Sequence, residues 1–375
     1  MYFNSFQFLL LFLPVTLLGF YLINRVEPCR WPIVWLVGAS LVFYGFCNLV
    51  LVGVLIGSVL TNYVLGRFFN DSQISKVNLK KILYFGIICN LGVLIYFKQF
   101  GFYGGSQPQE FSPAYPWGVI IPVGLSFFTF QQIIYLVEVW RGRVEGNSFW
   151  NYFLYVVFFP QLLNGPIVRP NEFFPQLVDK KFFKFQADRI AAGLTIFSCG
   201  LFKKVVLADG IARYSDSAFD AVAQGAVLSM MEAWSGTLSF TLQVYFDFSG
   251  YSDMAVGLGC LLGIRLPINF ESPYKASSLI EFWHRWHMTL SRFVRDYIYI
   301  PLGGNRKGSL KRTGNIFIIM LIGGIWHGTG TTFIVWGSLH GGLLAINHLW
   351  RQLQNSLGYS LERKNYIYEI SGCVI

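Results

Sequence analysis

Long apolar runs constrain this chain more than any other feature of its sequence. A helix needs about 20 apolar residues to cross a hydrocarbon core about 30 Å thick, and residues 6–24 form a first such run without a charged residue. In lipid the backbone must satisfy its own hydrogen bonds, which a helix does within one segment. We therefore predict an all-α polytopic integral membrane protein. Its further candidate spans are 31–47, 49–66, 82–98, 117–138, 190–208, 234–263, 313–326 and 330–349.

The composition agrees with a chain folded in lipid. Of its 375 residues, 54% are hydrophobic and 13% are charged, whereas soluble domains carry about 25% charged residues. No Gly/Ser or Pro linker divides the chain, so we expect one membrane domain over residues 1–375. The formal net charge of +10 comes from loop cations suited to anionic lipid headgroups. Nucleic acid is not an expected partner, because no basic stripe with interleaved aromatic residues is present.

Basic residues also predict the orientation of the first half. They follow the first span at Arg25 and Arg30, the third span within 67–81, and the fifth at Arg141 and Arg143. The positive-inside rule then places these loops in the cytoplasm and the N-terminus outside. No basic residue precedes the first span and no cleavage site follows it, so we expect a retained span rather than a signal peptide. Beyond residue 145 the alternation is lost.

Two segments are predicted to lie at the membrane surface. Residues 150–165 are aromatic and apolar but contain Pro160 and end near Pro166, which favours a re-entrant or interfacial piece. Residues 278–300 place Ile280, Trp283, His287, Leu290 and Val294 at helical spacing, which is typical of an amphipathic interfacial helix. An i,i+4 pair of Glu281 with Arg285 would support that helix.

Polar residues inside apolar runs are functional candidates, because lipid makes them costly. His327 lies next to a tryptophan and between glycines, and an imidazole is a suitable general base for a hydroxyl nucleophile. The alternative, a core histidine that joins helices through a hydrogen bond, has about equal weight. For Asp247 and Asp253, a structural role in capping broken helices is the favoured interpretation.

No metal site is expected. His284 and His287 are three residues apart and lack an obvious third ligand, which zinc would need. The six cysteines form no CxxC pair, so neither a disulfide framework nor a thiolate site is implied. The Gly-rich, basic segment 303–308 could hold phosphate through backbone donors and cations, although an ordinary solvated loop is the favoured interpretation.

Six segments together resemble the alginate O-acetyltransferase branch of the membrane-bound O-acyltransferase family. They occur in order over most of the chain, at 123–131, 158–169, 245–255, 281–287, 302–308 and 323–328. Each is weak alone, but the six in order are specific. The resemblance implies a helical bundle with a transbilayer tunnel, into which the acyl donor enters from the cytoplasm and the acceptor from outside.

The resemblance also implies residue roles. His327, in Trp-His-Gly, corresponds to the catalytic histidine, and His287, which closes Arg-Trp-His, would orient or polarise the reactants. His340, Asp253 and Trp326 are supporting candidates. Charge favours binding of the donor phosphates by Arg285, Arg306 and Lys307. No bound cofactor is required, because acetyl-CoA is an activated donor substrate.

The expected function is transfer of acetyl from cytoplasmic acetyl-CoA across the bacterial inner membrane for O-acetylation of an extracytoplasmic polysaccharide, alginate-like or peptidoglycan. The direct recipient is expected to be an extracytoplasmic partner protein or the polysaccharide. Transfer of D-alanyl to teichoic acid is the alternative within the family. A transporter or channel, and a non-catalytic scaffold of an exopolysaccharide complex, are alternatives from other classes. Relatives usually continue through further spans, so a truncated C-terminus is a further expectation.

Overall fold

The computed structural model describes residues 1–26, 30–46, 49–103, 122–144, 148–179, 184–306, 308–328 and 330–357. All regular secondary structure in these ranges is helical. Contacts group the chain into two compact units. Unit 1 comprises residues 1–101 and 117–268, and unit 2 comprises 102–116 together with the chain from Asn269 onward. This grouping by contacts does not test the expectation of one membrane domain over residues 1–375, which stays a prediction.

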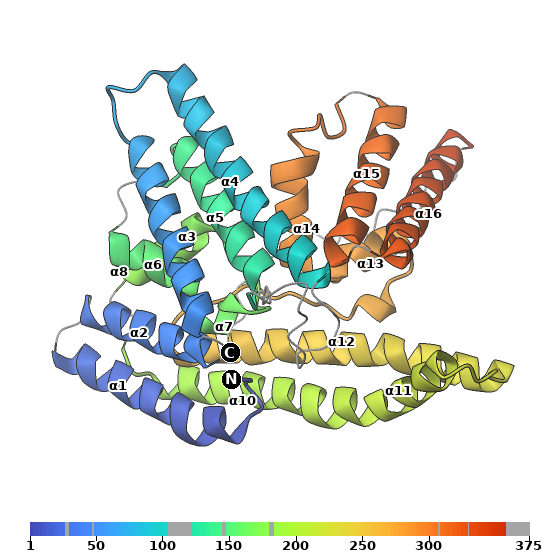
Figure 1. Cartoon of the computed structure of the whole chain (residues 1–375), viewed down its shortest axis with the longest axis horizontal. Helices are drawn as coiled ribbons and strands as arrows, with labels where there is room; N and C mark the ends of the chain where they lie inside the picture. The colour runs from blue at the N-terminus through green and yellow to red at the C-terminus, as the bar shows by residue number, and fades with distance from the viewer. Residues whose placement is uncertain are drawn as a thin grey trace. The chain divides into compact units, whose positions relative to one another are not determined.

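Unit 1 contains most of the long helices (Figure 1). A π-helical turn at Phe8–Phe12 leads into the first of them, and a second such turn at Lys203–Ala208 joins α10 to α11. The helices are α1 (Leu13–Val26), α2 (Trp31–Gly45), α3 (Leu49–Phe68), α4 (Lys76–Tyr103), α5 (Leu125–Trp140), α6 (Phe149–Val157), α7 (Phe159–Leu162), α8 (Pro170–Val178), α10 (Ala187–Phe202), α11 (Asp209–Ala223) and α12 (Met230–Leu261).

Four helical stretches in the described residues are long and apolar enough to cross a membrane. They are Phe8–Val26, Leu49–Phe68, Lys76–Lys98 and Ala187–Ala223, which confirms the predicted spans at 6–24, 49–66, 82–98 and 190–208. Trp31–Gly45 and Leu125–Trp140 are apolar but shorter. The predicted spans at 234–263, 313–326 and 330–349 coincide with helices, but these helices are not among the four. The all-α membrane fold is thus confirmed.

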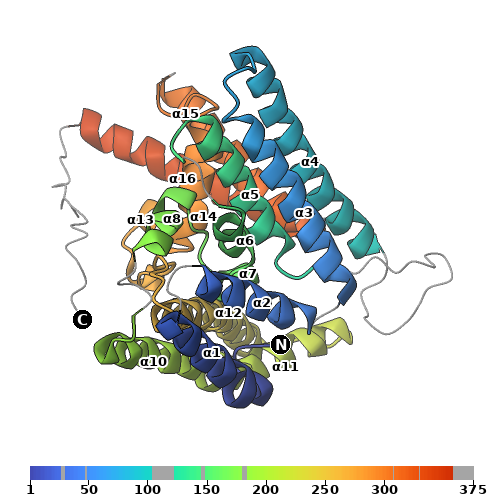
Figure 2. The same cartoon turned by 90° about the vertical axis from the view of Figure 1, so that its left-hand side faces the viewer.

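A buried polar cluster joins α3, α4 and α5, which lie side by side in Figures 1 and 2. Asn62 on α3 donates through Nδ2 to Asn90 Oδ1 on α4 (3.2 Å) and also to Gln132 Oε1 on α5. Asn90 Nδ2 donates in return to Asn62 Oδ1 at 2.7 Å. Hydrogen bonds of this kind hold helices together where water is absent.

Replacement of Asn90 by Ala is expected to destabilise unit 1 by about 1 kcal/mol, because Asn62 loses both of its hydrogen bonds to Asn90. Thermal unfolding of the purified protein in detergent measures the change. Thr61→Ala is the matched control, since Thr61 is exposed and its hydroxyl donates to Gly57 O of its own helix at 2.8 Å. Equal unfolding temperatures for the two variants would contradict a joining role for the cluster.

Helix α12 packs along α10 and α11, which follow each other end to end (Figure 1). No break occurs at Gly250, since α12 is continuous from Met230 to Leu261. A Cβ at Gly250 would lie 2.8 Å from Gly200 O, so this glycine allows the backbones of α10 and α12 to approach closely. The predicted capping role of Asp247 and Asp253 is therefore wrong. Asp253 Oδ2 pairs with Lys203 Nζ at 2.5 Å, and Asp247 Oδ1 with Lys204 Nζ at 2.6 Å.

The segment predicted to be re-entrant or interfacial folds as two short buried helices. Helix α6 ends at Val157, and α7 begins at Phe159 with Pro160 in its first turn, where a missing N–H costs no hydrogen bond. Pro160 therefore starts a helix rather than stopping one. All residues from Tyr152 to Leu163 are buried inside unit 1.

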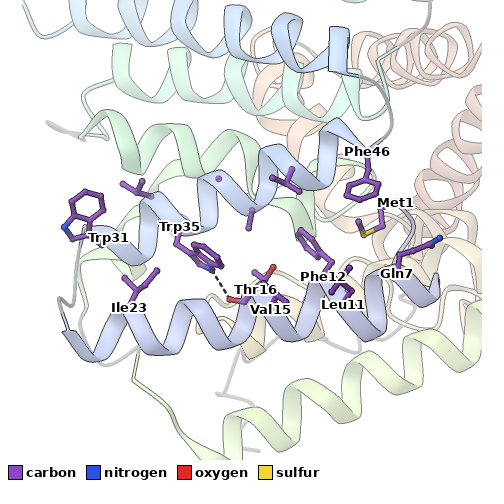
Figure 3. Close-up of a pocket in the computed structure, with 14 residues that line it drawn as sticks. Met1, Gln7, Leu11, Phe12, Val15, Thr16, Ile23, Trp31, Trp35 and Phe46 are labelled. Carbon is purple, nitrogen blue, oxygen red and sulfur yellow. Dashed lines mark hydrogen bonds between the residues drawn. The ribbon is translucent and has the colours of Figure 1, made fainter.

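An open apolar groove of about 730 Å³ lies between α1 and α2 (Figure 3). Trp35 Nε1 on α2 donates to Thr16 O on α1 at 3.0 Å and ties the two helices together. The lining residues all lie between Met1 and Phe46. The groove thus contains none of the predicted site residues.

Unit 2 contains the shorter helices and one helical hairpin. They are a 3-10 turn (Pro273–Lys275), α13 (Leu279–Arg285), α14 (Met288–Val294), a π-helical turn (Arg295–Tyr299), α15 (Ser309–His327) and α16 (Thr331–Ser356). The prediction of a single amphipathic helix over 278–300 is wrong, because the helix is interrupted at His287. The predicted pair of Glu281 and Arg285 is confirmed, with 2.7 Å between Oε1 and Nη2.

Candidate functional site

The end of α15 presents His327, and close packing of α15 on α16 determines its position. Helix α15 finishes at His327, and α16 starts four residues later at Thr331. A Cβ at Gly337 would lie 2.6 Å from Met320 O, and one at Gly341 would lie 2.9 Å from Phe317 Cδ2. The hairpin therefore depends on glycines at the contact between its two helices.

Aromatic rings surround His327 in this hairpin. The centroid of its imidazole lies 4.6 Å from that of Trp326 and 5.3 Å from that of Trp336. Trp336 also lies 4.6 Å from His340, which in turn lies 5.3 Å from Trp283 on α13. His327 itself is exposed. An accessible imidazole held among large rings is suited to meeting a substrate in a fixed orientation.

Gly337→Ala is expected to destabilise the hairpin by about 1–3 kcal/mol, because the added methyl must move the α15 backbone at Met320. His327 would shift with it, and activity should fall more than stability alone explains. Gly342→Ala is the control: it adds the same methyl five residues further along α16, where no neighbouring atom lies within 4 Å. Thermal unfolding and turnover measure both variants. A Gly337→Ala protein as stable and active as Gly342→Ala would contradict this packing argument.

His287 occupies a strained and buried position. Its φ of 43° is left-handed, a conformation uncommon outside glycine that occurs at functional sites. This residue is the N-cap of α14 and directly follows Trp286, the C-cap of α13. The side chain is 5% exposed, and Nδ1 lies 2.9 Å from Asn269 Oδ1. His287 lies outside the membrane-spanning helices, where burial and the charge of His327 lower its pKa to about 3.

The two histidines that the sequence singled out both belong to unit 2. His327 is close enough that its charge contributes to the lowered pKa of His287. Trp336 contacts both His327 and His340, and the Trp326 ring lies tilted beside His327. Two buried polar atoms, His340 Nδ1 and Trp283 Nε1, have no hydrogen-bond partner among the described residues. Unit 2 thus combines the exposed imidazole of His327, the buried neutral imidazole of His287 and polar atoms without a hydrogen-bond partner among the described residues.

The cations predicted to bind the donor differ in their availability. Glu281 holds Arg285, whose side chain is only 14% exposed. Arg306 is exposed after a turn in which Gly303 and Gly304 have positive φ, so it can reach an anion. Lys307 lies outside the described residues.

Asp253 belongs to unit 1, where Lys203 neutralises it. Its carboxylate forms an ion pair between packed helices of unit 1, and its supporting role in the site stays a prediction. Among the described residues, no group of three or more His, Cys, Asp and Glu side chains has the arrangement of a metal site.

Asn269 is a site residue that sequence reasoning missed. It is 1% exposed and contacts His287 from a segment 18 residues earlier in the chain. The one available signal was an amide in the mostly apolar run Leu-Pro-Ile-Asn-Phe.

Comparison with known proteins adds independent information. Residues 126–371 match the model of the MBOAT, membrane-bound O-acyltransferase family. The chain is 40% identical to a peptidoglycan O-acetyltransferase of Helicobacter pylori, with 96% of this chain and 73% of the relative covered. It is 38% identical to a probable alginate O-acetylase of Azotobacter vinelandii, over 94% of this chain and 69% of the relative. A teichoic acid D-alanyltransferase of Bacillus subtilis is 28% identical over 64% of this chain and 61% of its own length.

Proposed function

Because the chain belongs to the membrane-bound O-acyltransferase family, we propose that it transfers acetyl from cytoplasmic acetyl-CoA to a hydroxyl outside the membrane. The acceptor is a polysaccharide of the peptidoglycan or alginate class, reached directly or through an extracytoplasmic partner protein. The enzyme acts in the bacterial inner membrane. The names of the relatives at 40% and 38% identity support this proposal over D-alanyl transfer, since the D-alanyltransferase is more distant.

The observation that carries the proposal is the pairing of His327 and His287 within unit 2. His327 is exposed at a helix end, where a hydroxyl acceptor can reach it. His287 is buried, and its lowered pKa keeps it neutral at physiological pH. A neutral, fixed imidazole next to an accessible one suits general base catalysis.

In the proposed reaction His327 takes the proton of the acceptor hydroxyl as the oxygen attacks the thioester carbonyl. A C–O bond forms and the C–S bond breaks. The proton passes from the imidazole to the departing CoA thiolate, so that free thiol and ester are the products. The thioester is already activated, so deprotonation and positioning account for the catalysis that the protein must supply.

His327→Ala is expected to reduce acetyl transfer by about 100-fold or more, the usual contribution of a general base. Labelled acetyl-CoA is supplied to the purified protein in lipid nanodiscs, with peptidoglycan or alginate fragments as acceptors. Release of CoA thiol and labelled ester are both measured.

The matched control is His348→Gln on α16, where Nδ1 of His348 lies 3.3 Å from Arg312 Nη2; this variant should keep the wild-type rate. A folded His327→Ala protein with wild-type turnover would overturn the assignment of His327. If the wild-type protein uses a D-alanyl thioester on a carrier protein and leaves acetyl-CoA intact, the acyl group is D-alanyl instead.

A further inference from the structure

Two backbone hydrogen bonds hold the segment around Asn269 against the break at His287. Met288 N donates to Asn269 O at 2.9 Å, and Glu271 N donates to Arg285 O at 3.0 Å. The main chain on both sides of His287 is therefore tied to the main chain around Asn269. This backbone pairing places the side chains of Asn269 and His287 in contact.

The atom of Asn269 that faces His287 must be the amide oxygen. It accepts the backbone N–H of Thr289 at 3.3 Å and the Thr289 hydroxyl at 2.9 Å. A backbone N–H can only donate, so an amide nitrogen at that position would place two donors against each other. The same oxygen lies 2.9 Å from His287 Nδ1. Nδ1 must then carry a hydrogen.

We infer that Asn269 is a positioning residue that holds His287 in the Nδ1–H tautomer, so that only Nε2 can accept a hydrogen bond or a proton. This inference rests on the proposed function for its meaning in the reaction. In a neutral imidazole one nitrogen donates and the other accepts, and the partner of the first determines which is which. Asn269 acts through His287 and does not itself touch the substrate.

An amide is the appropriate partner where the imidazole must stay neutral. A carboxylate at the same place would also accept from Nδ1, but its charge would favour the imidazolium, in which Nε2 is a donor. The titratable groups on the segment after Asn269, on α13 and α14, and on the elements packed against these helices are Glu271, Tyr274, Lys275, Glu281, His284, Arg285, Arg292, Arg295, Asp296, Tyr297, Tyr299, His327, His340, His348 and Arg351. Among them, His327 disfavours the charged form of His287.

Asn269→Asp provides the decisive test, because the variant keeps the shape and all three acceptor contacts but adds a negative charge. The pKa of His287 should rise toward or above its ordinary value of about 6.5. Protonation of the general base His327 gives every variant one decrease in turnover at acidic pH. Asn269→Asp should add a second decrease as the pH falls through the raised pKa of His287, with recovery at higher pH, and the wild-type protein should lack this second step. Asn269→Ala should lose about 10- to 100-fold in kcat at every pH.

Asn78→Asp is the matched control, since it adds the same charge at an exposed position on α4 in unit 1. Its pH profile should match the wild type. An identical profile for Asn269→Asp and Asn78→Asp would overturn the inference, as a purely structural role of Asn269 predicts no new ionisation.

A second measurement does not depend on activity. Nitrogen-15 NMR of histidine-labelled protein distinguishes the two neutral tautomers, and the signals of His287 are assigned by their loss in His287→Gln. Signals of an Nδ1–H tautomer that change in Asn269→Ala support the inference, and an Nε2–H tautomer overturns it. If the wild-type protein transfers no acetyl group but shows the Nδ1–H tautomer, the proposed function fails while the role of Asn269 stands.

Discussion

A polar group shielded from water must find its hydrogen-bond partner inside the protein, and much of this structure depends on that constraint. In unit 1 it joins α3, α4 and α5 through Asn62 and Asn90. It also pairs Asp253 with Lys203 across two packed helices. In unit 2 the same constraint determines the chemistry of His287, because Asn269 Oδ1 is the acceptor for its Nδ1 hydrogen.

Close packing of α15 on α16 positions His327, the other histidine of the candidate site. Glycines at the contact of α15 and α16 let the two backbones approach until no side chain would fit. The C-terminal end of α15 is held there, and His327 is presented among tryptophan rings at 4.6 Å and 5.3 Å. Secondary structure thus positions the exposed imidazole, whereas side-chain hydrogen bonds position the buried one. A pair with such different environments can divide the work of proton transfer and orientation.

Sequence reasoning predicted much of the fold because hydropathy is a local property. Three predicted spans match helical stretches closely, and the fourth, 190–208, lies inside the longer stretch Ala187–Ala223. His287 and His327 were chosen from short motifs. Local patterns failed where a distant segment decides the outcome. The predicted helix over 278–300 breaks because backbone bonds from Asn269 and Glu271 hold the chain at His287. Asp253 has an ion-pair partner 50 residues away, which no spacing within its own helix could indicate.

The sequence by itself determined that this chain folds as helices in lipid, because the backbone of an apolar segment has few other ways to satisfy its hydrogen bonds there. It also singled out His327 and His287 as candidates, because imidazoles are rare in such runs and because the motifs around them resemble those of the family. Only the tertiary structure decided what each histidine can do. Protonation and tautomer depend on burial and on neighbours distant in the chain, and for His287 these are His327 and the amide oxygen of Asn269.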